Sequence, residues 1–238
     1  MSKPKISIAI PTWESHGKGN EFLSDLLSTI EVQKFNDFEV VISDHSKNDD
    51  LLLVVDQFKN KFEIKYHKNE ENRGNSPANL NKAIDKCSGE IIKIMFQDDF
   101  FYDDEALSKI YYALADTDEM WLLNGCNHTK DDGESFYWEL YPEFNDNLLD
   151  GVNTISSPSV VAFKEGVENR FDETLVYFMD IDFYYGMREK YGDPFYYNDI
   201  LVSNRFPHTH SISTNIQNRD IMSAKESEYC RKKYGVIK

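Results

Sequence analysis

The 238-residue sequence has few cysteines, few basic side chains and no long apolar run. Its three cysteines, Cys87, Cys126 and Cys230, show neither paired nor CxxC spacing, so neither a disulfide framework nor a zinc site is suggested. Only 26 lysines and arginines stand against 42 aspartates and glutamates, and the net charge of −16 disfavours nucleic acid as a partner because its phosphates would be repelled. The apolar run near the N-terminus is too short for a signal peptide, and no segment approaches a membrane span. We therefore expect a soluble cytoplasmic protein with at most peripheral contact with the inner face of the membrane.

Several motifs are also missing. No GxGxxG follows any expected strand, which argues against a dinucleotide-binding oxidoreductase. The loop over residues 11–19 (PTWESHGKG) offers little of the glycine-rich, basic phosphate loop that a sugar-phosphate nucleotidylyltransferase would carry. Neither an internal repeat nor a Pro/Gly/Ser-rich linker divides the chain. We expect a single domain over residues 1–238, with a nucleotide-binding half over 1–103 and an irregular acceptor-binding half over 104–238.

The first half alternates strand and helix patterns. Strands are expected at residues 5–11, 38–44, 62–67 and 90–101, and helices at 21–35, 51–58, 78–87 and 104–115. This order predicts an α/β fold with a mostly parallel central sheet and helices on both faces. The second half is less regular: strands are expected at 120–126, 135–141, 160–163 and 197–202, and helices at 179–191 and 219–233.

Two adjacent carboxylates follow the most apolar expected strand. Residues 90–101 read EIIKIMFQDDFF, and Asp98 and Asp99 stand where this strand leaves the core. Ligands of open α/β sheets bind outside the carboxyl ends of the strands, and paired carboxylates there suit Mg²⁺ or Mn²⁺. The alternative is that the pair caps the following helix, although Asp103 and Asp104 lie closer to its start.

These landmarks together resemble the inverting family-two glycosyltransferases of the GT-A fold. The segments that carry the resemblance keep the family's order and spacing, and they are Pro11–Thr12, VISDHSKND at 41–49, Gly74 with ANLNKA at 78–83, Ser88–Gly89–Glu90, FQDD at 96–99, FDETL at 171–175, MDIDFY at 179–184 and HTHSIS at 208–213. The sequence departs from the family pattern at Gln97, the first place of the usual D-x-D, at Met179, which replaces a glutamate, and at Ser43 and His45.

The resemblance implies a metal-dependent, inverting transfer of a sugar from a nucleoside diphosphate, UDP- or dTDP-linked, to a hydroxyl of a saccharide or lipid-linked acceptor. It implies that Asp44 accepts the N3–H of a pyrimidine, that Asp99 and His208 bind Mn²⁺ or Mg²⁺, and that Asp180 is the general base. We expect the remaining nucleotide-sugar contacts from Pro11, Thr12, Glu14, Arg73, Asn79 and Asp98.

Each assignment has an alternative. Asp44 and Asp180 can be caps, Asp182 is the better candidate for a helix-face carboxylate, and His210 competes with His208. Arg73 and Lys93 can be ordinary surface or strand-edge charges. A second kind of protein, a catalytically silent carbohydrate-binding module of the same fold, stays open because of Gln97 and Met179.

Aromatic and basic residues of the second half have two interpretations each. Trp121, Tyr137, Trp138 and Tyr141 can stack on acceptor sugars or pack in the core. The basic residues 231–233 can touch an anionic membrane or complement the end of a helix.

Overall fold

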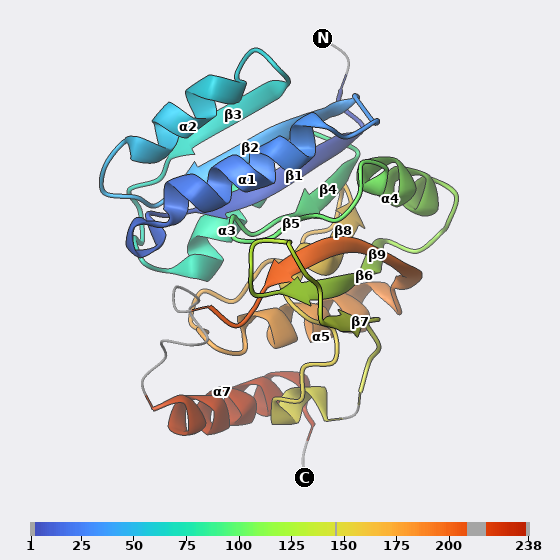
Figure 1. The fold of residues 1–238 in the computed structure, drawn as a ribbon. Helices are drawn as coiled ribbons and strands as arrows, with labels where there is room; N and C mark the ends of the chain where they lie inside the picture. Colours follow the sequence, from blue (N-terminus) through green and yellow to red (C-terminus); the bar gives the residue numbers. More distant parts are fainter. Residues whose placement is uncertain (1–2, 146, 209–217, 237–238) are drawn as a thin grey trace.

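The structure is a computed structural model and describes residues 3–145, 147–208 and 218–236 (Figure 1). The elements in chain order are β1 (Ile6–Thr12), η1 (Ser15–Gly17), α1 (Gly19–Glu31), β2 (Phe38–Asp44), α2 (Asp50–Phe58), β3 (Glu63–Lys68), α3 (Ser76–Asp85), β4 (Ile91–Ile94), β5 (Phe100–Phe101), α4 (Ala106–Ala115), β6 (Trp121–Thr129), β7 (Trp138–Leu140), η2 (Leu148–Asp150), η3 (Pro158–Val160), β8 (Val161–Lys164), α5 (Met179–Tyr191), β9 (Phe195–Arg205) and α7 (Arg219–Tyr234).

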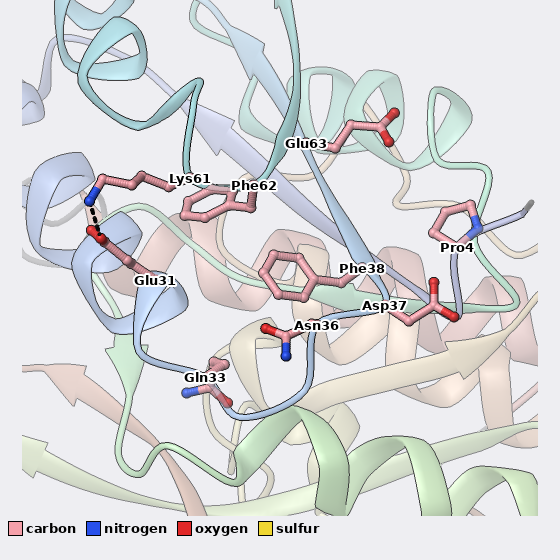
Figure 2. A pocket seen from close by; sticks show the side chains of 9 residues that line it. All are labelled: Pro4, Glu31, Gln33, Asn36, Asp37, Phe38, Lys61, Phe62 and Glu63. Carbon is pink, nitrogen blue, oxygen red and sulfur yellow. Dashed lines mark ion pairs between the residues drawn. The ribbon is translucent and has the colours of Figure 1, made fainter. Parts of the chain in front are cut away.

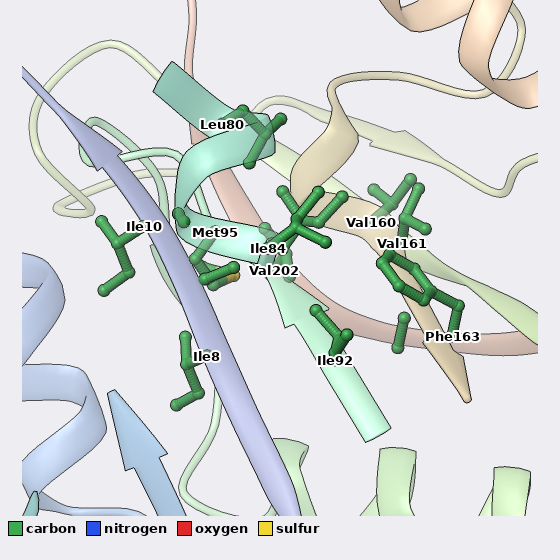
Figure 3. Packing of buried hydrophobic residues seen from close by; sticks show 14 of the residues in the cluster. Ile8, Ile10, Leu80, Ile84, Ile92, Met95, Val160, Val161, Phe163 and Val202 are labelled. Atoms are coloured by element: carbon green, nitrogen blue, oxygen red, sulfur yellow. The ribbon is translucent and has the colours of Figure 1, made fainter. Parts of the chain in front are cut away.

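The first half forms the parallel part of the sheet, in the order β3-β2-β1-β4. β1 and β2 pair in register from Ile6 opposite Phe38 to Thr12 opposite Asp44, and every residue of both strands is buried. α1 and α2 cover one face, and α3 packs against β1 and β2 on the other (Figures 1 and 3). The predicted α/β fold with helices on both faces is confirmed.

The second half joins this sheet largely through antiparallel pairs. β8 pairs antiparallel with β4 and β6, while β9 runs parallel to β6 and pairs antiparallel with β5 at the sheet edge. β7 adds a short antiparallel strand to the far end of β6. The parallel pairing that the sequence predicts is therefore concentrated in the first hundred residues.

The expected strand over residues 90–101 is wrong as a continuous element. β4 ends at Ile94, and Asp98 and Asp99 lie in a turn before the separate two-residue strand β5. The amide of Asp99 donates to the carbonyl of Phe96, which closes this turn. Because the turn redirects the chain, β4 pairs with β1 and β8, whereas β5 pairs with β9.

One hydrophobic core runs through both halves. Figure 3 shows Ile8 and Ile10 of β1 on one side of the strand and Leu80 and Ile84 of α3 on the other. Further along the sheet, Val161 and Phe163 of β8 belong to the same buried cluster. This continuity supports one unit rather than two independent domains, as domains would each have a core of their own.

A close backbone approach explains the glycine between α3 and β4. A Cβ atom on Gly89 would lie 2.6 Å from the amide nitrogen of Ser7, closer than real Cβ atoms come. The Gly89 amide donates instead to the Ser7 hydroxyl, at 2.7 Å. The turn at 88–89 therefore packs directly on β1 and sets where β4 enters the sheet.

Among the described residues, no helix is both long enough and apolar enough to cross a membrane.

Candidate active site

The carboxyl ends of β1, β2 and β4 meet at one edge of the sheet. The chain order reverses between β1 and β4, which are neighbours although β2 and β3 lie between them in sequence. Such a switch point is where open α/β sheets bind ligands. Pro11 and Thr12 end β1, Asp44 ends β2, and the turn with Asp98 and Asp99 follows β4.

Asp44 is fully buried and surrounded by hydrogen-bond donors. Its Oδ1 accepts from the Ser46 amide at 2.8 Å, and its Oδ2 accepts from the Tyr66 hydroxyl at 2.5 Å and from Lys68 Nζ at 3.1 Å. Burial and the Asp44 carboxylate raise the pKa of Tyr66, which keeps that hydroxyl a donor. An ionised carboxylate offers about four lone-pair sites, and the Thr12 hydroxyl, 3.4 Å from Oδ1, is a fourth donor beside these three. The Thr12 hydroxyl also lies 3.4 Å from the Ser43 carbonyl, so it can turn to that carbonyl and leave one site of Asp44 for an added N–H.

Asn79 supports the loop ends around Asp44. Its Nδ2 donates to the Thr12 carbonyl at 3.0 Å, and its Oδ1 accepts from the Ser43 hydroxyl at 2.7 Å. Asn79 thus lies beside Thr12, and its predicted contact with a nucleotide sugar stays a prediction. Its amide, however, serves to hold the ends of β1 and β2 together.

Glu14 and Arg73 are the more open of the predicted contacts. The half-buried Glu14 immediately precedes η1, and its carbonyl accepts from the amides of Gly17 and Gly19. Arg73 is exposed in the loop before α3, where Nη2 lies 3.5 Å from Glu70 Oε1. The carboxylate beside Arg73 is therefore that of Glu70, and the contact of Arg73 with a nucleotide stays a prediction.

Gln97 links the Trp13 loop to the end of β4. Its carboxamide accepts from the Trp13 amide at 2.7 Å, and its Nε2 donates to the Trp13 carbonyl at 3.0 Å and to Ser15 Oγ at 2.6 Å. Only an amide can make this donor-and-acceptor set; an ionised carboxylate cannot donate. The departure from D-x-D therefore has a structural explanation, which the family pattern alone does not reveal.

Asp98 and Asp99 point to different partners. Asp99 is buried and accepts from Ser157 Oγ at 3.0 Å, and burial together with the Asp98 carboxylate raises its pKa. Asp98 Oδ2 lies 3.0 Å from His208 Nε2, and the Asp98 carbonyl accepts from Arg205 Nη1 at 2.9 Å. His208 thus contacts Asp98 rather than its predicted co-ligand Asp99. His210 lies outside the described residues.

The donor set of this turn fits a divalent cation bound together with substrate. Carboxylate oxygens and an imidazole are suitable ligands for Mn²⁺ or Mg²⁺, and Mg²⁺ commonly takes one or two carboxylates plus substrate phosphates. Within residues 3–145, 147–208 and 218–236, the side chains do not form a preassembled group of three His, Cys, Asp or Glu ligands. Asp98, Asp99 and His208 would therefore supply part of a coordination shell.

Asp180 lies in the first turn of α5 and is half-buried. Its Oδ2 accepts from Asn153 Nδ2 at 2.8 Å, and its Oδ1 accepts from the Ile181 amide at 2.8 Å. Burial raises the pKa of Asp180 to about 6, and the carboxylate of Glu226 contributes in the same direction. Asp182, two residues later, is instead tied to α7 by Lys233 and Tyr234. A carboxylate with a raised pKa at the edge of a site is well suited to accept a proton.

The model of glycosyl transferase family 2 matches residues 7–167. The chain belongs to glycosyltransferase family 2. Among its relatives, a GalNAc(5)-diNAcBac-PP-undecaprenol beta-1,3-glucosyltransferase of Campylobacter jejuni is 34% identical over 106 residues, 44% of this chain and 31% of that protein. The poly(ribitol-phosphate) beta-N-acetylglucosaminyltransferase TarS of Staphylococcus aureus is 30% identical over 98 residues, 40% of this chain and 16% of TarS. This family 2 chain thus spans less than a third of the length of these relatives.

Solved structures support the GT-A fold of this family 2 chain. TarS residues 1–349 in complex with UDP-GlcNAc superpose with a TM-score of 0.72 at 18% identity, covering 95% of this chain and 66% of that one. A mannosyltransferase of Pyrobaculum calidifontis, in complex with GDP-Man and Mn²⁺, gives a TM-score of 0.64 at 18% identity and covers 88% of this chain and 59% of that one.

A short loop connects the two carboxylate sites of this family 2 fold. Ser157, the partner of Asp99, accepts from Asn204 Nδ2 at 2.9 Å. Its neighbour Ser156 has a φ of 96°, a conformation that is costly for a residue with a side chain. The Ser156 carbonyl accepts at 3.1 Å from Asn153 Nδ2, the same group that contacts Asp180. Asn153, Ser156, Ser157 and Asn204 are residues that sequence reasoning missed, because no motif marks them.

Two further features lie away from this site. A cavity of about 370 Å³ lies at the opposite end of the strands, lined by residues such as Pro4, Phe38 and Phe62 and bordered by the Lys61–Glu31 ion pair (Figure 2). The three basic side chains at the end of α7 are paired with carboxylates. Arg231 pairs with Asp150, Lys232 with Glu228, and Lys233 with both Asp172 and Asp182. Their charge is thus largely compensated within the protein, which weakens the argument for contact with anionic lipid.

Proposed function

We propose that this chain transfers a sugar from a UDP- or dTDP-sugar to a hydroxyl of a saccharide or lipid-linked acceptor, with inversion at the anomeric carbon. The observation that carries the proposal is the loop Asn153–Ser157, which contacts both Asp99 and Asp180. Transfer to a hydroxyl needs charge compensation at the departing diphosphate and a base at the acceptor. We assign the first task to Asp99 and the second to Asp180, which contact the same short loop.

The donor would bind across the ends of β1, β2 and β4. We assign the base of the nucleotide to Asp44, whose Oδ1 can accept an N3–H in place of the Thr12 hydroxyl, with Thr12 and Glu14 on the adjacent loop. Pro11, Arg73 and Asn79 complete the proposed nucleotide-sugar contacts. The complexes of TarS with UDP and with UDP-GlcNAc favour a UDP-linked donor, while the GDP-Man complex of the Pyrobaculum enzyme shows that the fold admits another base.

At the diphosphate, we assign metal binding to Asp99 and His208, with Asp98 beside them. A bound Mn²⁺ or Mg²⁺ would supply Lewis-acid stabilisation of the departing diphosphate. Asp180 accepts the proton of the attacking hydroxyl, and Asn153 holds its carboxylate in place. Positioned proton transfer of this kind contributes about 10²–10⁴-fold in rate.

The acceptor classes named for the relatives, an undecaprenol-linked glycan and a poly(ribitol phosphate), support a place in cell-surface glycan synthesis. We propose that the chain acts at the cytoplasmic side of the membrane on such a substrate. The silent-module alternative loses part of its motivation, because Gln97 is engaged with the Trp13 loop.

The test begins with a thermal-shift panel of UDP-, dTDP- and GDP-sugars, each with and without Mn²⁺ or Mg²⁺. A ligand at 100 times its dissociation constant adds about 2.7 kcal/mol to the free energy of unfolding, which is readily measured. We expect a metal-dependent shift with UDP- or dTDP-sugars that Asp44→Ala and Asp99→Asn abolish. Asp56→Asn, on the exposed side of α2 and paired only with Lys59, is the matched control.

A second measurement addresses the chemistry. Release of the nucleotide from the identified donor should survive in Asp56→Asn and fall by at least about 10²-fold in Asp180→Asn, because the base is lost. The anomeric configuration of the product, followed by NMR, decides between inversion and retention. No shift with any donor, or full turnover in Asp180→Asn, would contradict the proposed function.

A further inference from the structure

Exposed aromatic rings gather at the hairpin of β6 and β7. Tyr137 and Trp138 are each 48% exposed, and Phe206, which follows β9, is 40% exposed. The Tyr137 hydroxyl donates to the Phe206 carbonyl, which links the two segments. Trp121, at the other end of β6, is by contrast completely buried and belongs to the core. The surface made by Tyr137, Trp138 and Phe206 is called the aromatic platform below.

Trp138 is held in one orientation. His128, its partner across the β6–β7 pair, stacks on the indole with ring centroids 4.4 Å apart and an angle of 17° between the planes. The His128 ring is buried, and its Nδ1 lies 3.0 Å from the Trp138 carbonyl. Because one indole face is covered while the residue stays half-exposed, the other face is open to solvent.

The aromatic platform is continuous with the carboxylate of the proposed metal site. His128 is the register partner of Asn204 on the parallel strand β9, so their side chains leave the same face of the sheet. Asn204 donates to Ser157, which donates to Asp99. Phe206 lies two residues before His208, which contacts Asp98.

The segment that follows β7 contacts the loop that holds Asp180. After β7, the Glu143 carbonyl accepts from Thr154 Oγ1 at 2.6 Å, and the Glu143 amide donates to the Thr154 carbonyl at 3.3 Å. Thr154 is adjacent to Asn153, which donates to Asp180. The hairpin is therefore connected both to the leaving-group side of the site and to the base.

The charges around the aromatic platform restrict its ligand. The exposed carboxylates Asp132, Glu134 and Glu139 belong to the same hairpin, in a chain with a net charge of −16. Asp132 is paired with Arg205, and Lys130 Nζ lies 4.7 Å from the centroid of the Tyr137 ring, so one cation touches the platform while Glu134 and Glu139 keep the hairpin acidic. Carboxylates repel a phosphate but accept hydrogen bonds from hydroxyls. An open aromatic face suits the C–H face of a pyranose. A ligand with an apolar face and many hydroxyls but no charge satisfies both conditions.

We propose that the aromatic platform binds an uncharged pyranose of the acceptor, with the ring stacked on Trp138. This inference rests on the proposed function and narrows its acceptor to a neutral saccharide, in contrast to a poly(ribitol phosphate). The sugar stacked on Trp138 lies beside the hydroxyl that Asp180 deprotonates.

The test uses the full chain without a donor, so that it does not depend on turnover. The three tryptophans are labelled with 5-fluorotryptophan, and the Trp138 signal in the fluorine NMR spectrum is assigned with Trp138→Phe. The probes are the methyl β-glycosides of glucose, galactose, GlcNAc and GalNAc, with ribitol 5-phosphate as the anionic counterpart. We expect one or more glycosides to shift the Trp138 signal at millimolar concentration while the signal of the buried Trp121 stays in place.

Variants establish that the platform is responsible. Trp138→Ala should weaken glycoside binding, measured by saturation-transfer NMR, by about tenfold or more, and Trp138→Phe, which keeps an aromatic ring, by less. The control is Tyr112→Ala, which removes a ring that is 59% exposed on α4, and its binding should equal that of the unmodified protein.

Three results would overturn the proposal: no glycoside shifts the Trp138 signal, Trp138→Ala binds as tightly as the unmodified chain, or ribitol 5-phosphate binds as well as the glycosides. Each is independent of the nucleotide-sugar panel. A shift with nucleotide sugars but not with glycosides would remove the platform and leave the proposed function intact. The reverse result would remove the proposed function alone.

Discussion

Replacing Glu226 should destabilise the helix that carries Asp180, although the two residues lie on different helices. Glu226 is a buried carboxylate of α7, and it accepts hydrogen bonds from three consecutive amides that precede α5. The distances are 3.0 Å from Val176, 2.9 Å from Tyr177 and 2.8 Å from Phe178. The first amides of a helix and those leading into it have no carbonyl partner within the helix, so Glu226 serves as its cap from a distance.

The expected magnitude follows from these three bonds. A hydrogen bond to a charged group contributes about 1.5–3 kcal/mol, but the three are not additive, and water can reach the amide of the 45% exposed Val176. We therefore expect Glu226→Ala to lower the free energy of unfolding by about 3 kcal/mol. At about 2–4 °C per kcal/mol for a chain of this size, the melting temperature should fall by roughly 6–12 °C.

The assay is urea unfolding followed by circular dichroism, with Glu228→Ala as the control. Glu228 lies on the same helix and its ion pair with Lys232 is exposed, so its removal should change the free energy of unfolding by less than about 0.5 kcal/mol. Glu226→Gln tests the charge itself, and it should also lower the pKa of Asp180, because the Glu226 carboxylate helps to raise it. Equal stabilities of Glu226→Ala and Glu228→Ala would refute the reasoning.

Three further predictions concern single side chains: Asp180 and Gln97 of the site, and Lys93 of β4. Lys93 is fully buried and donates to Asn124 and Ser159, so its interpretation as a surface or strand-edge charge was wrong. Burial raises the pKa of Asp180 from 3.8 to about 6, so the folded state binds this proton more tightly, and stability is lost as the pH rises from 3.8 to 6. In urea titrations, Asp180→Asn should therefore be more stable than the unmodified protein at pH 8, by up to about 2 kcal/mol, and equally stable near pH 3. Burial lowers the pKa of Lys93 to about 7, so the unfolded state binds more protons than the folded state between pH 7 and 10.5, and stability rises with pH in this range. Lys93→Met should remove this rise. An unchanged slope of unfolding free energy against pH would contradict the prediction. Gln97→Asp restores the family's D-x-D but loses the donors to Trp13 and Ser15, so we expect a loss of about 1–3 kcal/mol in unfolding free energy and no gain in Mn²⁺ affinity by calorimetry.

The first half of the fold could be predicted well from the sequence because its signals are local. The strand at Phe38–Asp44 and the helix at Met179–Tyr191 have the predicted bounds, and the other helices differ by a few residues at their ends. The continuous strand over residues 90–101 was wrong because β5 depends on pairing with β9, about a hundred residues later in the chain.

The candidate site could be predicted only in part, for the same physical reason. Carboxylates after strands mark Asp44, Asp98 and Asp99, since parallel strands bring their carboxyl ends to one edge. Ser157, which donates to Asp99, and Glu226, which caps the helix that carries Asp180, bond to groups about fifty residues or more away, and their own sequence context is ordinary. The amino-acid sequence likewise does not indicate which tryptophan is exposed: Trp121 is buried in the core, whereas Trp138 lies at the surface.

Arg205 limits how this chain can be recombined with its relatives. Its buried guanidinium pairs with Asp25 of α1 at 2.6 Å and with Asp132 of the β6–β7 hairpin at 2.7 Å, and it donates to the Asp98 carbonyl. A chimera that keeps residues 1–103 and takes the rest from a member without this arginine would leave Asp25 without its cation and the Asp98 carbonyl without this donor. The reverse chimera would leave the buried guanidinium without Asp25. Exchange of acceptor halves should therefore succeed only when the partner supplies an arginine at the same place.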